Sequence, residues 1–218
     1  MDKNLILIAS PPASGKTYVC EHIAKALGQA VYLDKDDLTL LVRAAFSVAG
    51  REFDMDGEFY KKNLRDLEYQ TLMHIAFSNL RFENCVLVNA PLGKEIRSSE
   101  YMKALKEKAN ANGARLMLIW VSSPSEICRE RMTKRGSDRD TLKLASWEDY
   151  VKNINYTPPY ELKKCGAVDD FLVFDNKDEK AFDESMKKAL GLIKRHLFCG
   201  NLQQKASIDI KKDTKKNL

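Results

Sequence analysis

The segment that most constrains this chain is residues 10–17, which read SPPASGKT. It follows residues 5–9, LILIA, a short apolar run typical of a strand that is covered on both faces. A helical pattern begins at Lys16. The pattern G-x-x-x-x-G-K-S/T between a strand and a helix forms a loop that cradles phosphate groups. Gly15, Lys16 and Thr17 match it, so the sequence predicts a phosphate-binding loop.

Each part of this loop has a chemical role. Unpaired backbone N–H groups at the start of a helix attract phosphate oxygens, because they lie at the positive end of the helix dipole. Lys16 can reach the β- and γ-phosphates of a nucleotide, and the hydroxyl of Thr17 can ligate Mg²⁺. We therefore predict ATP and Mg²⁺ as ligands, with Thr17 as the metal ligand. The predicted nucleotide contacts come from Pro12, Ala13, Ser14, Gly15, Lys16 and Thr17.

Ser10 departs from the pattern, since it stands where the first glycine is usual. A serine can occupy this turn unless its φ angle must be positive, because only glycine adopts positive φ without strain. The alternative interpretation is an ordinary Ser/Pro turn before a helix with a surface lysine. The position directly after an apolar strand favours the phosphate loop.

Strands and helices alternate along the chain, which predicts an α/β fold. We expect a three-layer sandwich, in which a parallel five-stranded sheet has helices on both faces. The predicted strands are residues 5–9, 30–33, 85–89, 115–122 and 171–174. The predicted helices are residues 16–27, 38–48, 58–82, 97–112, 125–135, 146–155 and 179–198, with Ser125 as an N-cap. Residues 50–57 and 136–141 are predicted to be polar loops.

The length of 218 residues suits one domain, residues 1–198, followed by a polar basic tail at residues 199–218. From residue 201 onward the tail holds five lysines and two aspartates, so most of the net charge of +5 lies there. The nearly neutral body gives little support for a nucleic-acid groove. A solvated, frayed tail is favoured over one that binds polyanions.

The cysteines are scattered, odd in number and without a C-x-x-C pair, which favours reduced, buried thiols in a cytoplasmic protein. They are Cys20, Cys85, Cys128, Cys165 and Cys199. The longest apolar run, residues 116–121, is too short to cross a bilayer. We therefore predict no membrane partner. The three histidines, His22, His74 and His196, lack a metal-binding spacing.

Three acids follow the second predicted strand: Asp34, Asp36 and Asp37. Ligands of open α/β sheets bind outside the carboxyl ends of the strands, so a carboxylate here can face a bound γ-phosphate. It can then accept the proton of a hydroxyl that attacks phosphorus. We favour Asp36 as this base and keep Asp34 as the rival. Asp37 is a candidate N-cap for the next helix.

The stretches ILIASPPASGKT and YLDKDDL resemble the start of small P-loop kinases of the polynucleotide-kinase, zeta-toxin and chloramphenicol-phosphotransferase type, often described as AAA-family ATPases. The resemblance covers residues 4–41 and extends more loosely to about residue 175. It implies a P-loop NTPase fold and places Asp36 on the general base of these kinases. Thr39 stands where they often have an arginine that binds phosphate or orders the site, which leaves the acceptor unidentified.

The resemblance also implies a lid at about residues 124–146, whose arginines close on the phosphates. Arg131 and Arg135 are four residues apart and share a helical face, and Arg139 is a further candidate. Arginine suits this task because its planar fork stabilises charge on phosphoryl oxygens. The alternative is a solvated basic face that pairs with nearby acids.

Two functions remain open. The first is a kinase that moves the γ-phosphate of ATP to a hydroxyl of a small molecule, a nucleotide or, less favoured, a nucleic-acid end, with Lys16, Asp36, Arg131 and Arg135 as catalytic residues. The second is a nucleotide-dependent regulatory protein with slow ATPase activity. Asn89 keeps the second open, because many P-loop proteins carry an acid at the end of the third strand. Asn89 either orients a water molecule or only closes the strand.

Overall fold

The computed structural model describes residues 3–213, with the side chains of residues 3–137, 140–195 and 197. Its strands form one parallel sheet in the order β2-β3-β1-β4-β5. They are β1 (Lys3–Ala9), β2 (Val31–Asp34), β3 (Cys85–Asn89), β4 (Ala114–Ser122) and β5 (Asp170–Asp175). This sheet confirms the predicted parallel, five-stranded α/β fold.

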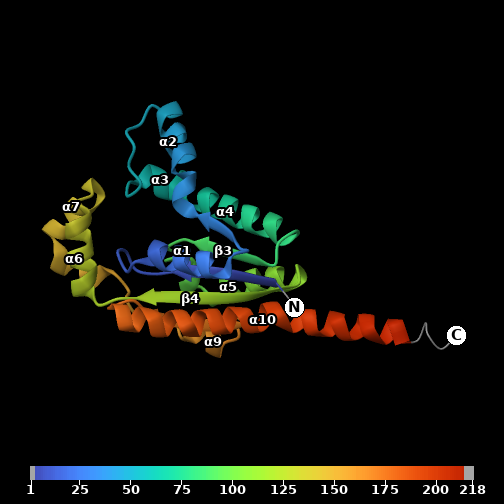
Figure 1. The fold of residues 1–218 in the computed structure, drawn as a ribbon. Coiled ribbons are helices and arrows are strands. Elements are labelled where there is room, and N and C mark those ends of the chain that lie inside the picture. The colour runs from blue at the N-terminus through green and yellow to red at the C-terminus, as the bar shows by residue number, and fades with distance from the viewer. Residues whose placement is uncertain (1–2, 214–218) are drawn as a thin grey trace.

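Helices pack on both faces of the sheet (Figure 1). The longer helices of the described chain are α1 (Lys16–Leu27), α2 (Thr39–Val48), α4 (Arg65–Leu80), α5 (Ser99–Ala111), α6 (Ser125–Arg135) and α10 (Glu179–Asp213). Of these, α1 and α10 cover one face of the sheet, and α4 and α5 cover the other. The shorter ones are η1 (Lys35–Leu38), α3 (Glu58–Asn63), η2 (Glu95–Arg97), α7 (Asp138–Ala145), α8 (Trp147–Asn153) and α9 (Glu161–Lys164).

Alternate side chains of β1 belong to two separate cores. Leu5 and Leu7 pack in the core under α4 and α5, whereas Ile6 and Ile8 pack in the core under α1 and α10. Burial on both sides explains why the strand is a continuous apolar run rather than an alternating one. The central strands are therefore rigid supports for the loops that follow them.

Two helical projections lie at the end of the sheet where the strands finish (Figure 1). One consists of α2 and α3, which share a small core of Val42, Phe46 and Tyr60. The other consists of α6 and α7, which follow β4. The phosphate loop after β1 lies at this same end, so the projections flank the predicted site.

The predicted helix at residues 58–82 is wrong in one respect, since the chain breaks at Leu64 into α3 and α4. The break lets Leu64 pack against the small core of the α2–α3 projection. The predicted polar loop at residues 136–141 is also wrong, because α7 begins at Asp138. The loop signals there are confined to Gly136 and Ser137, and the backbone N–H of Asp140 already bonds to the carbonyl of Ser137.

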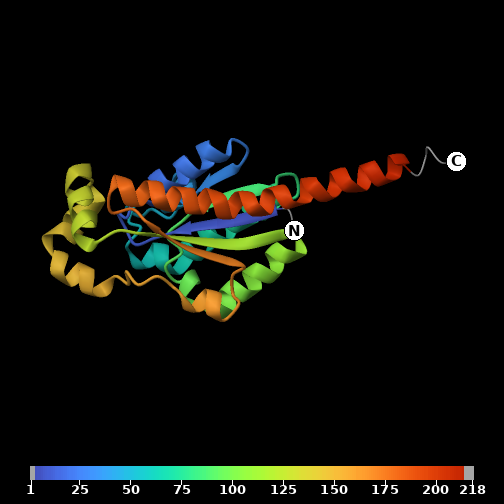
Figure 2. The same ribbon diagram turned by 60° about the horizontal axis from the view of Figure 1, so that its bottom comes forward.

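The last helix is longer than predicted, because α10 continues from residue 198 to Asp213. It runs along the sheet and projects past it (Figures 1 and 2). Residues 199–213 contain no proline, so a helix that has already formed can extend through them at little cost. The predicted tail at 199–218 therefore begins as helical backbone, and residues 214–218 lie outside the described part.

The described cysteines are free thiols. Three of them are buried as expected: Cys20, Cys85 and Cys128. Cys165 is exposed instead, because it follows the short surface helix α9. The side chain of Cys199 lies outside the described part. In residues 3–213 we find no helix with the length and apolar character needed to cross a membrane.

Candidate active site

The phosphate loop has a backbone that only certain residues can adopt. Gly15 has φ of +84°, and a Cβ atom added there would lie 2.3 Å from Nδ2 of Asn176, so glycine is required for two reasons. Among the described residues other than glycine, only Ala13 (φ 61°) and Leu92 (φ 51°) have positive φ. Ser10 is therefore unstrained, and its hydroxyl donates to the carbonyl of Pro11 at 2.8 Å. The missing first glycine does not prevent the loop from forming.

Asn89 lies at the centre of the hydrogen-bond network below this loop. The ammonium of Lys16 donates to its Oδ1, and its Nδ2 lies 3.1 Å from the hydroxyl oxygen of Thr17. The same Nδ2 approaches Oδ2 of Asp34, which also accepts a hydrogen bond from the Tyr32 hydroxyl at 2.8 Å. Asn89 thus does more than close its strand, and it joins the phosphate loop to the acids after β2.

Strand register explains this meeting. Asp34, the last residue of β2, pairs with Asn89, the last residue of β3. Since the strands are parallel, both side chains end at the same edge of the sheet. The hydrogen bond to Asp34 and burial both raise the pKa of Tyr32, burial being the larger cause, so the Tyr32 hydroxyl keeps its proton and acts as a donor.

Asp34, and not Asp37, caps the turn that follows β2. Its Oδ1 accepts the backbone N–H of Asp36 at 2.9 Å, and its extended φ and ψ angles are those of an N-cap residue. The helix α2 begins after Leu38 without a side-chain cap, so the predicted cap at Asp37 is wrong. Asp36 is exposed and lines a pocket that residues of the phosphate loop also line.

The charge of Lys16 is destabilised by its surroundings. Burial lowers its pKa, and the nearby carboxylates of Asp34 and Asp36 oppose this shift. A buried ammonium that is short of counter-charge favours an anionic ligand. The electrostatics therefore suit a phosphate group at this position.

Lys35 ties the acid turn to the α2–α3 projection. Its ammonium forms a buried ion pair with Glu68 of α4 at 2.9 Å, and Tyr60 of α3 donates to the same carboxylate oxygen. The ammonium also lies 6.0 Å from the ring centroids of both Tyr60 and Tyr69. Sequence reasoning missed this cluster, because its members are far apart along the chain and lie in no motif.

The guanidinium of Arg131 braces the phosphate loop through a hydrogen bond to its backbone. It donates to the carbonyl of Ser14 at 3.1 Å, to Oγ of Ser123 at 3.0 Å and to the carbonyl of Asn176 at 2.7 Å. Asn176, which follows β5, is buried and donates its Nδ2 to the same Ser14 carbonyl at 2.8 Å. The loop is thereby tied to α6 and to the segment after β5.

Arg135 lies at the junction of α6 and α7. Its guanidinium donates through Nε and Nη2 to Oδ2 of Asp140, at 2.9 and 2.6 Å, and the Asp140 carboxylate is buried. The predicted cap of α6 at Ser125 is wrong, since Pro124 occupies the N-cap position and the Ser125 hydroxyl donates to Glu126 instead. The side chain of Arg139 lies outside the described part.

One pocket of about 410 Å³ joins these elements. Its walls come from the phosphate loop, from the acid turn after β2 and from α6 and α7. The lining residues used below are Lys16, Thr17, Asp34, Asp36, Arg135 and Lys143. Every predicted catalytic residue, Lys16, Asp36, Arg131 and Arg135, lines this pocket.

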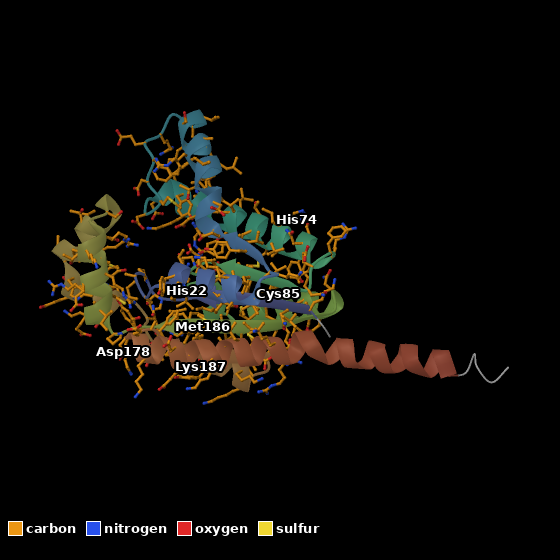
Figure 3. The ribbon with its side chains drawn as sticks, viewed as in Figure 1. His22, His74, Cys85, Asp178, Met186 and Lys187 are labelled. Carbon is orange, nitrogen blue, oxygen red and sulfur yellow. The ribbon has the colours of Figure 1, made fainter. Side chains whose placement is uncertain are left out.

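The histidines take no part in the pocket lining. His22 of α1 and His74 of α4 lie on opposite faces of the sheet (Figure 3), and Nδ1 of His22 is 2.8 Å from the carbonyl of Tyr18. The side chain of His196 lies outside the described part. Within that part, no cluster of three or more His, Cys, Asp or Glu side chains could hold a metal ion on its own.

Comparisons with known proteins agree with this fold. No curated protein sequence matches the chain. Among solved structures, the APS kinase CysC of Mycobacterium tuberculosis, in complex with AMPPNP and APS, aligns with 89% of this chain and 99% of its own (TM-score 0.51, 18% identity). Kti12 of Chaetomium thermophilum, in complex with ADP-AlF3, aligns over 86% and 98% (TM-score 0.53, 16% identity).

The shikimate kinase of Bacteroides thetaiotaomicron aligns with 87% of this chain and 97% of its own (TM-score 0.50, 12% identity). At these identities the likeness concerns the fold, which is that of small P-loop kinase-like NTPases, as the sequence resemblance implies. Residues 5–156 match a family model described as AAA domain. Since that match covers more than half of the sequence, the chain belongs to this AAA domain family.

Proposed function

We propose that the protein is an ATP-dependent phosphotransferase, which moves the γ-phosphate of ATP to a hydroxyl of a small molecule or nucleotide. The observation that carries the proposal is the shared pocket, which holds a phosphate-loop lysine, a carboxylate after β2 and the α6–α7 projection together. The kinase-like fold supports it as well. Lys16 and the loop from Pro12 to Thr17 bind the phosphates of the nucleotide.

The residues near Thr17 fit Mg²⁺, which prefers hard oxygen ligands and keeps several of its waters. The Thr17 hydroxyl would be the direct ligand, and the carboxylate of Asp34 lies in the same network through Asn89. When bound, the ion offsets negative charge on the phosphates. Asn89 holds the oxygens of Thr17 and Asp34 in place through hydrogen bonds to both.

Asp36 is our proposed base. The carboxylate of Asp34 already accepts hydrogen bonds from Tyr32, from Asn89 and from the backbone of Asp36, which favours a positioning role for Asp34. Asp36 is exposed and lines the pocket, and we assign this side of the pocket to the acceptor. In the reaction, the acceptor oxygen forms a bond to the γ-phosphorus, the bond to the ADP oxygen breaks, and the hydroxyl proton passes to Asp36.

We also propose a cytoplasmic location, on the ground of the unpaired thiols. The partners we propose are ATP and the acceptor. A nucleic-acid acceptor is not favoured, because the body of the protein carries little net charge. The regulatory alternative with slow ATPase activity rests on Asn89, which brings no negative charge to the end of β3.

The test compares Asp36→Asn with Asp34→Asn in a screen for transfer of labelled γ-phosphate to nucleosides, sugars, aminoglycosides and 5′-hydroxyl oligonucleotides. We expect Asp36→Asn to lower transfer by ~10²- to 10⁴-fold, the usual contribution of a positioned base, with MgATP affinity nearly unchanged. Transfer by Asp36→Asn at the parent rate would show that the base is another residue. Slow hydrolysis without any acceptor would favour the regulatory function.

A further inference from the structure

Arg131 and Arg135, two arginines of α6 that line the pocket, already have hydrogen-bond partners. Arg131 has three acceptors among the loop and the strand ends, and Arg135 is paired with the buried carboxylate of Asp140. These bonds use three of the five N–H donors of Arg131 and two of those of Arg135, and they direct each guanidinium toward its present partners. A phosphoryl group that is being transferred needs cationic stabilisation, so a further cation that lines the pocket can contribute to it.

Lys143 of α7 meets this requirement by its position. It is three residues after Asp140 and therefore lies on the same face of the helix. Both residues line the pocket that contains the phosphate loop, whereas Leu142 between them is 82% exposed. The ion pair between Arg135 and Asp140 fixes this face of α7 toward the pocket.

Lys143 is a partly buried residue, and its ammonium takes part in no ion pair or hydrogen bond with the other residues that the structure describes. Three donors on a flexible four-carbon stem can reach across a pocket to a phosphate as a compact point charge. In the part of the chain described, Lys143 and Lys16 are the two pocket lysines without a carboxylate partner within 4.0 Å.

We infer that Lys143 is a phosphate-binding residue that contacts the γ-phosphate of ATP from the side opposite the loop. The inference rests on the proposed function, since it assumes that the loop holds ATP. Phosphate loops of this kind hold the β-phosphate with their N–H groups and lysine. With ATP held in that way, the γ-phosphate would project into the pocket that Asp36 and Lys143 both line. ADP lacks the group that Lys143 would contact.

This geometry predicts a selective change in affinity. A hydrogen bond between charged groups contributes enough that its loss weakens binding by roughly 10- to 100-fold. Lys143→Ala should therefore weaken MgATP by roughly that factor and leave MgADP within about twofold. Lys143→Arg keeps the charge and should retain most of the ATP affinity.

The experiment is calorimetric titration of full-length protein with MgATP and MgADP, for the parent, Lys143→Ala, Lys143→Arg and Lys134→Ala. Lys134 is the matched control, because it is an exposed lysine on α6 that does not line the pocket. Binding by the parent shows that the protein takes MgATP, as the proposed function requires. The ratio of ATP to ADP affinity in Lys143→Ala then tests Lys143 separately.

A fall in that ratio for Lys143→Ala, with Lys134→Ala at the parent value, supports the inference. An unchanged ratio while the parent binds MgATP overturns the role of Lys143 and leaves the proposed function in place. An equal loss of both nucleotides also overturns the γ-phosphate contact. Failure of the parent to bind MgATP overturns the proposed function and this inference together.

Discussion

Arg131→Ala separates two roles that the pocket allows for this arginine. If Arg131 is mainly a brace of the phosphate loop, its removal should lower stability in the absence of nucleotide. If it acts only on bound phosphates, the nucleotide-free protein should be as stable as the parent. The contacts of its guanidinium with the carbonyls of Ser14 and Asn176 favour the brace.

The expected loss of stability depends on which hydrogen-bond donors remain for the acceptors of Arg131. Without Arg131, the Ser14 carbonyl still accepts from Nδ2 of Asn176 at 2.8 Å, and the Asn176 carbonyl still accepts from the Ser123 hydroxyl at 2.9 Å. No buried carbonyl is left without a donor, so the loss should be that of one charge-assisted hydrogen bond, ~2 kcal/mol, rather than three. For a domain of this size that corresponds to a fall of ~4–8 °C in Tm.

The assay is thermal unfolding followed by circular dichroism, without nucleotide, for Arg131→Ala, Arg131→Lys and Arg129→Ala. Lysine cannot reproduce the fork, so Arg131→Lys should lose nearly as much as alanine. Arg129 is exposed on the same helix, and its guanidinium lies 5.8 Å from the ring centroid of Trp147, without an ion pair to another described residue. Its loss should therefore cost under ~1 kcal/mol. A parent-like Tm for both Arg131 variants would refute the brace.

Three further outcomes are expected. Gly15→Ala should abolish MgATP binding, because the new Cβ would lie 2.3 Å from Nδ2 of the buried Asn176 and the backbone φ is +84°. Titration with MgATP measures this change, and an affinity equal to that of the parent would contradict it. Since burial lowers the pKa of Lys16 and phosphate binding needs its proton, MgATP affinity should fall as pH rises through that lowered pKa, with proton uptake on binding. Calorimetry in buffers of different ionisation enthalpy detects the uptake, and no buffer dependence up to pH 10 would count against it. Glu68→Gln should destabilise the protein by ~3–5 kcal/mol in urea unfolding, because it leaves the buried Lys35 ammonium without its counter-charge; a loss under ~1 kcal/mol would show that the pair is not needed.

Much of the fold follows from local patterns. The strand Cys85–Asn89 and the helix Lys16–Leu27 have the predicted bounds, and α6 ends at Arg135 as predicted. Strands buried on both faces are short apolar runs, and glycine ends helices at defined positions. Leu64 interrupts a predicted helix through packing against distant residues, which no local pattern records.

The residues of the site also differ in how far local sequence patterns predict their positions. Lys16 and Thr17 belong to a contiguous motif, so their places could be predicted. The partners of Asn89 depend on the register between β2 and β3, and those of Arg131 are backbone carbonyls on two other segments. Contacts of this kind arise from tertiary structure and leave no signal in residue type or spacing.

The hydrogen bond between Lys16 and Asn89 orients the ammonium before any nucleotide is bound. This bond uses one of the three N–H donors of the ammonium, so two donors remain for phosphate oxygens. Asn89 is a neutral partner, so it directs the ammonium without neutralising its positive charge. The loop therefore presents an oriented cation, and it selects a ligand by negative charge as well as by shape.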